Sequence, residues 1–519
     1  MKKTMKQHSF ASRLKSLAFV FGIALAFASC ANEDIAQNPN GTDNNKNFTI
    51  FSTGDPATRT SMESNGAFYW EAGDKIWVKD DNGTWRQSRN APTEKTASFK
   101  FEVPGKFTKT TTYKVYYPGQ NGNQNQVTIA ANQSQAEPNT TAHFGTSGDC
   151  GMADAAWSNT KNGFAFTLDH KAAYLLFLPR TSNTILHDCY LTKVEVNSDN
   201  DITSTYTLDP TTGKLTGTGT DKQIMVELGG SGTYANGFPL TNNATSAATN
   251  GAYVVIKPGT HTLKIRYWVK DIATNVEGTI TKVLSSKIFE QNKYYNITAN
   301  LDVRDYDGDH YYMWDAQQNY WSGHEWNSAN PWQPVLNIRS NGNYAQSNTD
   351  SRYYNESYPG YGLSNPATHT SCKDLPNANE MTWYAVKGDP RYDRDELWTA
   401  MGHLYKGGMW FKKKAYISGY NVNTAPDGTD WRTNTNTRDW YTSIIPPSAA
   451  DASNYFYLTD LGLYNDGQLI GIGYSGFYWS SSAEPRTSHV AYTLRFSPGS
   501  VGVVYGNRKQ GVRVEPSFE

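Results

Sequence analysis

Cysteine is scarce in this sequence, which holds four among its 519 residues. Cys30 follows an apolar leader, so Cys150, Cys189 and Cys372 remain for the rest of the chain. An odd number of cysteines cannot form a complete disulfide framework. A single bond between Cys150 and Cys189 stays open, because spacing alone does not test it. The sequence therefore predicts a fold that is not held together by disulfides.

Charge is also sparse and nearly balanced. Charged residues make up 18% of the chain, and the formal net charge is −1. A protein that binds nucleic acid needs an excess of cations to neutralise phosphates, so a nucleic-acid partner is not expected. Long apolar runs are lacking too, except for "LAFVFGIALAFA" at 17–28. Twelve residues are too few to span the ~30 Å core of a bilayer.

The first thirty residues have the pattern of an export signal, a basic stretch followed by that apolar run. Two cleavage sites compete: "AFA" before Ser29 suits ordinary signal peptidase, and "FASC" resembles a lipobox ending at Cys30. The lipobox is favoured, because a lone cysteine at this point has no packed core to serve. Glu33 and Asp34 resemble an export signal of surface lipoproteins. We expect a signal peptide over 1–29, lipidation of Cys30, and an outer-membrane, cell-surface location.

Aromatic and small residues are plentiful, with 34 Tyr, 15 Trp and 43 Gly, a mixture typical of β-rich extracellular binding proteins. Residues 30–47 read as a flexible tether. Beyond it, "ASFKFEV" at 97–103 and "HTLKIRYWV" at 261–269 alternate apolar with polar residues, and "AYLLFL" at 173–178 is a solid apolar run. Alternation predicts half-buried strands, and the solid run predicts a strand buried on both faces. Residues 48–303 are therefore expected to form a β-sandwich region. It has either one module or two, and two modules would meet near 170–185.

Three stretches of this half resemble the fimbrillin-like (type V pilin) family of bacterial lipoproteins. They are "TRTSM…FYWEAGDKIWV" (58–78), "FAFTLDHKAAYLLFLP" (164–179) and "KIFEQNKYYNITANLDV" (287–303). The resemblance implies transthyretin-like β-sandwich modules and a place in a fimbrium. It also implies assembly with other pilin subunits by strand addition, after a protease cuts behind an arginine and an N-terminal strand leaves. Arg59 is the expected cut, and an uncut surface arginine is the alternative.

The next segment, 304–312, is expected to be an acidic linker. Asp305, Asp307 and Asp309 are spaced as in a calcium loop, but the glycine and the final glutamate of that loop are missing. After it, "DRDELWTAMGHLYKGG" at 393–408 predicts a helix that begins at Asp393 or Asp395 and ends at two glycines. The chain then closes with short strand-like runs.

Two stretches of this second half resemble C-type-lectin-like, or paralogous lectin-like, modules. They are "SCKDLPNANEMTWYAVKGD" onward (371–414) and "FYWSSSA" through "VRVEP" (477–516). The resemblance implies an α+β C-type-lectin-like domain over 313–519, behind the N-terminal sandwich of a mainly β protein. Because "GVRVEPSFE" looks like the last strand of that domain, no spare strand is left to donate. A tip or minor subunit is therefore expected rather than a stalk subunit.

The serine run Ser480–Ser482, with His489 nearby, has no nucleophile elbow around it, so we expect no enzyme activity. Its hydroxyls are expected to bond the backbone while Tyr478 and Trp479 fill the core. Zinc-like spacings are absent. At Glu484-Pro485-Arg486 an arginine stands where calcium lectins of this fold carry a cation ligand. No cofactor is expected; calcium stays open without support from a motif, since Asp393, Asp395, Asp427 and Asp430 can still build a site.

Tryptophan and tyrosine suit both cores and sugar-binding surfaces. Core packing is expected to use most tryptophans of the second half. Those in polar loops are expected to be exposed: Trp321, Trp326, Trp332, Trp431 and Trp440. The loop "APDGTDWRTNTNTRDWY" at 425–441 is the most polar aromatic-bearing one, and long loops of this kind often carry function. Ligand contact is assigned to Trp431, Trp440, Asp427, Asp430, Trp321 and Trp326.

These observations predict a fimbrial tip or minor subunit that acts as an adhesin. The N-terminal half docks on other subunits, and the C-terminal half binds a glycan or a protein. The alternative is a surface lipoprotein that does not polymerise and binds glycans for uptake.

Overall fold

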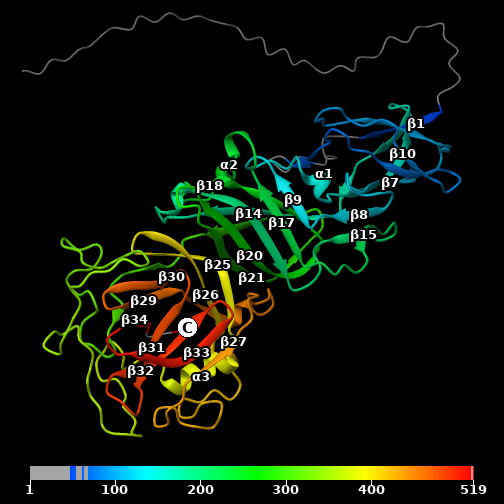
Figure 1. Ribbon diagram of the computed structural model, residues 1–519. Coiled ribbons are helices and arrows are strands. Elements are labelled where there is room, and N and C mark those ends of the chain that lie inside the picture. The colour runs from blue at the N-terminus through cyan, green and yellow to red at the C-terminus, as the bar shows by residue number, and fades with distance from the viewer. Residues whose placement is uncertain (1–46, 54–60, 63–67, 516–517) are drawn as a thin grey trace, which may run out of the picture. The chain divides into compact units, whose positions relative to one another are not determined.

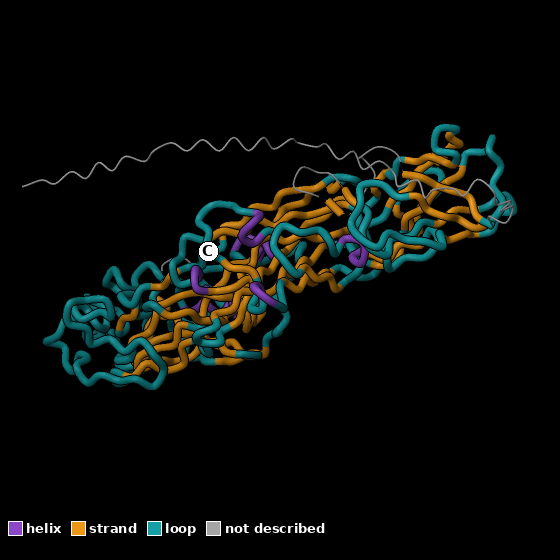
Figure 2. The backbone as a smooth tube through the Cα atoms, turned by 90° about the horizontal axis from the view of Figure 1, so that it is seen from above, coloured by secondary structure: helices purple, strands orange, loops and turns teal. Residues whose placement is uncertain are grey.

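A computed structural model describes residues 47–53, 61–62, 68–515 and 518–519, and residues 47–519 make up one compact unit (Figure 1). The fold is mainly β, with short helices and long loops (Figure 2). The described α-helices are α1 (Phe144–Ser147), α2 (Ala247–Asn250) and α3 (Ala378–Lys387), beside single 3-10 turns at Leu186–Asp188, Gly232–Tyr234, Lys414–Tyr416 and Ala452–Asn454. None of the helices in the described part of the chain is long and apolar enough to cross a bilayer. Cys30 and Arg59 lie outside the described residues.

The first sheet encloses an aromatic core. Its strand order is β5-β4-β7-β10-β11-β1-β6, with β12 beside β10. Phe101 and Val103 are buried and Lys100 is exposed, which confirms the predicted alternation. The bounds are β1 (Phe48–Thr53), β4 (Trp77–Lys79), β5 (Trp85–Gln87), β6 (Lys100–Pro104), β7 (Tyr113–Tyr117), β10 (Gly151–Ser158), β11 (Gly163–Phe166) and β12 (Asp169–His170), with β2 (Ser61–Met62) paired to β3 (Phe68–Tyr69).

Strand β1 lies inside this sheet rather than at its edge. It runs antiparallel to β6 on one side and parallel to β11 on the other. Phe51 is fully buried and stacks on Phe164, with ring centroids 4.9 Å apart. β1 is therefore a structural strand of the first core.

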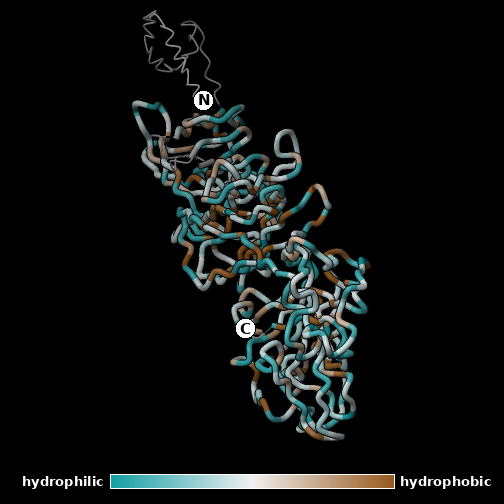
Figure 3. The backbone as a smooth tube through the Cα atoms, turned by 90° about the vertical axis from the view of Figure 1, so that its left-hand side faces the viewer, coloured by the Kyte–Doolittle hydropathy of each residue, from teal (hydrophilic) through white to brown (hydrophobic). Residues whose placement is uncertain are grey.

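A second core lies between a three-stranded sheet and a larger one. The small sheet has the order β19-β13-β22, and all but the last residue of β13 are buried, as the apolar run predicted. The bounds here are β8 (Gln126–Ile129), β9 (Asn132–Gln135), β13 (Ala173–Arg180), β14 (Cys189–Ser198), β15 (Ser204–Leu208), β16 (Leu215–Thr216), β17 (Gln223–Leu228), β18 (Phe238–Pro239), β19 (Ala252–Ile256), β20 (Gly259–Asp271), β21 (Glu277–Phe289) and β22 (Tyr294–Asn300). Short hydrophobic stretches alternate with hydrophilic ones along the chain (Figure 3).

The third region packs around the sheet β27-β33-β32-β31-β34-β29-β30. Tyr478 and Trp479 of β31 are buried in its cores, as predicted. The bounds are β23 (Asp305–Tyr306), β24 (Tyr311–Tyr312), β25 (Arg391–Ala400), β26 (His403–Lys412), β27 (Arg438–Tyr441), β28 (Tyr455–Thr459), β29 (Leu461–Asn465), β30 (Gln468–Ile472), β31 (Gly476–Ala483), β32 (Val490–Ser497), β33 (Ser500–Asn507) and β34 (Gly511–Arg513). The expected linker at 304–312 contains β23, which pairs with β25, and β24, which pairs with β34.

The helix predicted over 393–408 is wrong, because this segment forms the hairpin β25–β26. Met401 and Gly402 make its two-residue turn with φ of 49° and 80°, and positive φ at both positions is the requirement of a type I′ hairpin turn. Gly407 and Gly408 end no helix. A Cβ on Gly408 would lie 2.3 Å from the carbonyl oxygen of Leu458, so the glycine lets β28 approach.

The hairpin β25–β26 joins the second core to the third region. The large sheet has the order β28-β26-β25-β21-β20-β14-β17-β9, with β25 parallel to β21 at Thr279 and Glu396. Leu397 and Leu404 are buried in the second core. In Figure 1 the hairpin lies beside β20 and β21. Strand pairing therefore crosses the boundary expected near residue 303.

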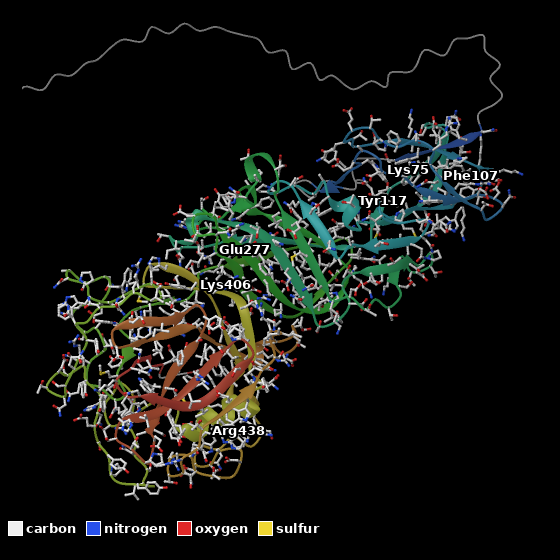
Figure 4. The ribbon with its side chains drawn as sticks, in the orientation of Figure 1. Lys75, Phe107, Tyr117, Glu277, Lys406 and Arg438 are labelled. Atoms are coloured by element: carbon white, nitrogen blue, oxygen red, sulfur yellow. The ribbon has the colours of Figure 1, made fainter. Side chains whose placement is uncertain are left out.

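Buried charges fill the junction. Lys264 and Arg266 point away from the second core, as the alternation predicted, yet they are 8% and 7% exposed, because Lys264 bonds the carbonyl oxygen of Pro447 and Arg266 bonds Asp393 of β25. Arg266 donates to Asp393 at 2.8 Å, and Thr279 and Thr281 donate to Glu396. Lys406 Nζ donates to the carbonyl oxygen of Glu277 at 2.7 Å, and both residues are labelled in Figure 4.

Cys150, Cys189 and Cys372 are free and buried. The bond between Cys150 and Cys189 that the sequence left open is therefore not formed. Burial raises the pKa of the Cys189 and Cys372 thiols to about 12, so both stay protonated at neutral pH.

Candidate functional site: a cleft with two tryptophans

Helix α3 forms one wall of the candidate site, and local sequence explains where it begins and ends. The Asn377 side chain accepts from the N–H of Glu380, whose carboxylate accepts in return from the N–H of Asn377. This capping box satisfies two orphan donors of the first turn. At the other end, the N–H of Gly388 bonds the carbonyl oxygens of Trp383 and Tyr384.

The loop that follows Ala425 forms the floor. Trp431 is 4% exposed, and its backbone N–H donates to Asn379 of α3 at 2.8 Å. Asp430 accepts from Asn379 and from Arg432, at 2.9 Å and 2.8 Å. The loop is therefore fastened to the helix through Asn379, which is itself fully buried.

Strand β27 forms the second wall. It pairs with β33, and Trp440 lies opposite Val501 of the buried sheet. The Trp440 ring stacks beside that of Trp431, with centroids 6.4 Å apart and planes inclined by 26°. The guanidinium of Arg438 lies 5.9 Å from the centroid of the Trp440 ring.

These elements enclose a cleft of about 200 Å³. It is lined by Thr382, Val386 and Lys387 of α3, by Ala425, Pro426, Asp427 and Trp431 of the loop, and by Arg438 and Trp440 of β27. Figure 4 labels Arg438 beside α3. A concave site with aromatic walls and a few polar groups is the usual form of a binding site for a small ligand.

Asp427 is a fixed polar group on the rim of the cleft. Its carboxylate accepts from the N–H and hydroxyl of Thr429 and from the indole N–H of Trp431, the last at 3.1 Å. Burial alone raises the pKa of Asp427, but these hydrogen bonds outweigh it and hold the pKa below its ordinary value. The carboxylate is therefore ionised at neutral pH and locked in one orientation.

The structure brings Trp431, Trp440 and Asp427 together, whereas other predicted ligand residues lie elsewhere. Trp321 and Trp431 were expected to be exposed, and this is wrong: Trp321 is fully buried with its ring against that of Tyr464, and Trp431 is 4% exposed. Trp326 is half-buried and packs against the turn at Gly402. Asp430 supports the loop through its pairs with Asn379 and Arg432 rather than lining the cleft. Their ligand roles stay untested.

Several residues of the cleft were missed by reasoning from sequence. They are Thr382, Val386 and Lys387, from a helix that was not predicted, and Arg438, from a strand beside the loop. The signal for the helix was present, since Asn377 and Glu380 have capping-box spacing before an apolar run that stops at Gly388. No local signal connects Arg438 with this helix, because the contact is made through β33.

The remaining carboxylates named from sequence do not join the cleft. Asp393 is paired with Arg266 and lines a separate small cavity of about 10 Å³. Glu484 accepts from the N–H groups of Arg486 and Thr487 and from the hydroxyl of Thr435. Its lone pairs are thus directed at protein donors rather than at an ion.

The serine run is explained by backbone hydrogen bonds, as predicted. Ser480 and Ser482 are buried, and the Ser480 hydroxyl donates to the carbonyl oxygen of Ser482 at 3.1 Å. The Ser482 hydroxyl accepts from the N–H of Ala378 at 3.2 Å, at the start of α3. The run therefore supports the helix that forms the cleft.

A cluster of possible metal ligands lies in the segment before β24. Ligand atoms of Asp307, Asp309 and His310 lie within 4.8 Å of one another. The hydrogen bond that His310 donates to the Asp307 carboxylate raises the pKa of His310. Arg513 Nη1 lies 3.2 Å from Asp307 Oδ1. Arg513 therefore offsets part of the negative charge of Asp307.

No protein-family model matches this chain, and no curated protein matches it. Solved structures show weak likenesses. A candidate cell adhesion protein from Bacteroides ovatus shares 16% identity over 49% of this chain and 93% of its own, with a TM-score of 0.29. A fimbrial protein from the same species shares 11% identity over 90% and 98%, with a TM-score of 0.25. A candidate polysaccharide-binding protein from Bacteroides thetaiotaomicron shares 12% over 49% and 91%, with a TM-score of 0.23. Likenesses at these TM-scores assign no function to the chain.

Proposed function

We propose that this chain is a cell-surface adhesin of the fimbrial type, a tip or minor subunit that binds a glycan through the cleft of Trp431 and Trp440. The observation that carries the proposal is the pair of nearly parallel indoles in a concave site. Trp431 is held from below by Asn379 and Asp427, so its ring is fixed before a ligand arrives. Preformed aromatic surfaces of this kind cost little conformational entropy on binding.

A sugar suits this cleft better than an extended peptide does. The C–H face of a sugar ring packs on an indole, and its hydroxyl groups seek fixed polar partners at the rim. Asp427 offers such a partner, a carboxylate that Thr429 and Trp431 hold in one orientation. A volume of about 200 Å³ is of the order of one or two sugar rings.

The N-terminal half is proposed to dock on other pilin subunits by strand addition. Cleavage behind Arg59 would release β1, whose N–H and C=O groups now pair with both β6 and β11. Its departure would leave an open slot in the sheet and remove Phe51 from an aromatic core. An incoming strand would restore both the hydrogen bonds and the buried ring. A lipid on Cys30 would hold the precursor at the outer membrane.

The test of binding is an array of glycans and host-matrix proteins, probed with the chain from residue 47 in calcium and in chelator. We expect the Trp440→Ala variant to lose at least tenfold in affinity for any hit. Trp326→Ala is the matched control, since it removes a half-buried indole outside the cleft. Binding that survives Trp440→Ala but not Trp326→Ala would contradict the assignment of the site.

The test of docking is the N-terminus of the protein recovered from cells, read by mass spectrometry. A chain that begins at Thr60 supports cleavage and strand release. A chain that keeps the lipidated Cys30 on mature fimbriae would contradict docking through the slot of β1, and it would favour a surface lipoprotein that does not polymerise.

A further inference from the structure

The cleft contains two cations without an acidic partner. Lys387 is exposed at the end of α3, and Arg438 is exposed on β27 across the same cleft. Among the residues that the structure describes, neither side chain forms an ion pair or a hydrogen bond. Other arginines nearby differ: Arg432 pairs with Asp430 at 2.8 Å, and Arg495 pairs with Asp439 at 2.9 Å.

The carboxylates closest in sequence to Arg438 are directed elsewhere. Asp439 follows it in β27, so its side chain points to the opposite face of the strand, where it accepts twice from Arg495. Gly502 makes room for this pair, because a Cβ there would lie 1.9 Å from Asp439 Oδ1. Asp430 is occupied by Arg432 and Asn379. The strand thus holds Arg438 toward the cleft and its potential partners away from it.

Among the described residues that line the cleft, Asp427 is the single carboxylate, against the two cations. It lies on the rim, where Thr429 and Trp431 supply three donors to it. Its charge is therefore stabilised within its own loop, which leaves a net positive cleft floored by indoles. Two cations beside apolar rings attract an anion, above all a carboxylate that a guanidinium can hold with two parallel bonds.

We propose that the ligand of this cleft is an anionic sugar, whose carboxylate or sulfate lies between Lys387 and Arg438 while its ring packs on Trp440. This inference rests on the proposed function and narrows its ligand class. Specificity follows from the same geometry, since a neutral sugar leaves both cations unpaired and gains the stacking contact alone.

The test uses the chain from residue 47 and an array of matched glycan pairs. Oligogalacturonate is compared with its methyl ester, and a sulfated galactan with its desulfated form. We expect the charged member of a pair to bind at least tenfold more tightly than the neutral one. The affinity for the charged member should fall as the salt concentration rises. Carboxylated and sulfated pairs separate the two sources of negative charge.

Two variants locate the effect. Arg438→Gln and Lys387→Gln should each weaken binding of the charged member about tenfold and leave the neutral member unchanged. Lys373→Gln, which removes the same charge from an exposed position outside the cleft, should change neither. Because Lys387 and Arg438 have exposed side chains without hydrogen bonds, both variants are expected to fold, which circular dichroism checks.

The outcomes separate this inference from the proposed function. Equal binding of charged and neutral members, lost on Trp440→Ala but not on Arg438→Gln, overturns the anionic ligand and keeps the adhesin site. Binding of charged members that survives both lysine and arginine variants also overturns it. Absence of binding to every member of every pair by the folded chain contradicts the anionic sugar and the glycan-binding function together.

Discussion

At the junction, Arg266 and Asp393 form an ion pair that is almost completely withdrawn from water. Asp393 also accepts from the indole N–H of Trp410 at 3.2 Å. The pair itself adds little net stability, because desolvation offsets the attraction between the charges. Removal of one partner is different, since it leaves the other charge buried and alone.

We therefore predict that Asp393→Ala lowers the free energy of unfolding by about 3–5 kcal/mol. Asp439→Ala is the control, because it breaks an ion pair with Arg495 that is more than 40% exposed on both sides and should cost no more than about 1 kcal/mol. Urea unfolding of both variants measures the difference. Equal losses would show that the junction pair is not buried as described.

Glu396 makes the free energy of unfolding depend on pH. Burial, with a contribution from the negative charge of Asp393, raises its pKa from 4.5 to about 7, although Thr281 and Arg266 act in the opposite direction. Between these two values the folded chain holds a proton that the unfolded chain has released. The free energy of unfolding therefore falls as pH rises through this window, and the contribution levels off above about pH 7.

Glu396→Gln should remove this slope, since glutamine imitates the protonated acid and the hydroxyls of Thr279 and Thr281 can turn to accept from it. Relative to the native chain, the variant should gain roughly 2 kcal/mol between pH 5 and pH 8. Denaturant midpoints across that range test it. Asp460, whose pKa burial also raises to about 7, adds a slope of the same sign, so some dependence should remain. Curves that stay parallel would contradict the prediction.

Hairpin β25–β26 depends on its turn. Gly402 has φ of 80°, and the preceding Met401 is already at 49°. A β-branched residue at such an angle is strained, so Gly402→Val should destabilise the chain by about 1–2 kcal/mol. Gly402→Asn should cost much less, because asparagine tolerates the left-handed region. Equal midpoints for the two variants in urea would be inconsistent with a type I′ turn here.

The same hairpin was not predicted from the sequence, and the reason is physical. Residues 393–408 have helical spacing, with Leu397, Met401 and Leu404 on one stripe, and a short apolar run does not tell a helix from a buried strand. Partners distant in sequence decided the outcome, since β21 and β28 each pair with the hairpin. The strands predicted at 97–103, 173–178 and 261–269 are present, because each stretch holds the hydrophobic pattern of a strand within its own residues.

The candidate site was predictable in part for the same reason. Trp431, Trp440 and Asp427 lie in one stretch of sequence, 425–441, whose polarity and aromatic content marked it as a binding candidate, although its last residues form β27. Trp321 shared that local appearance, yet it is buried against Tyr464, which contacts it from a distant part of the chain. Exposure of an aromatic residue depends on such tertiary neighbours, and a single sequence does not give them.

For the whole molecule, one sheet is shared by the second core and the third region, through the pairing of β25 with β21. The third region should therefore be less stable when it is alone. A fragment of residues 310–519 would expose Leu397 and Leu404, which burial stabilises by roughly 3–5 kcal/mol together, and would leave Asp393 without Arg266. We predict a lower urea midpoint for this fragment than for residues 47–519. A fragment of residues 120–519, which keeps the second core apart from Tyr116, should retain most of the stability of the third region. Identical midpoints for 310–519 and 47–519 would contradict a joined fold.

The central claim is that ligand binds between α3, the 425–431 loop and β27. Hydrogen–deuterium exchange of residues 47–519, with and without a glycan from the array, tests it most directly because it reports every region at once. We predict slower exchange on binding at 425–441 and 382–388, with no change at 320–332. Protection confined to 320–332 or to the N-terminal sheets, with none around Trp431 and Trp440, would contradict it.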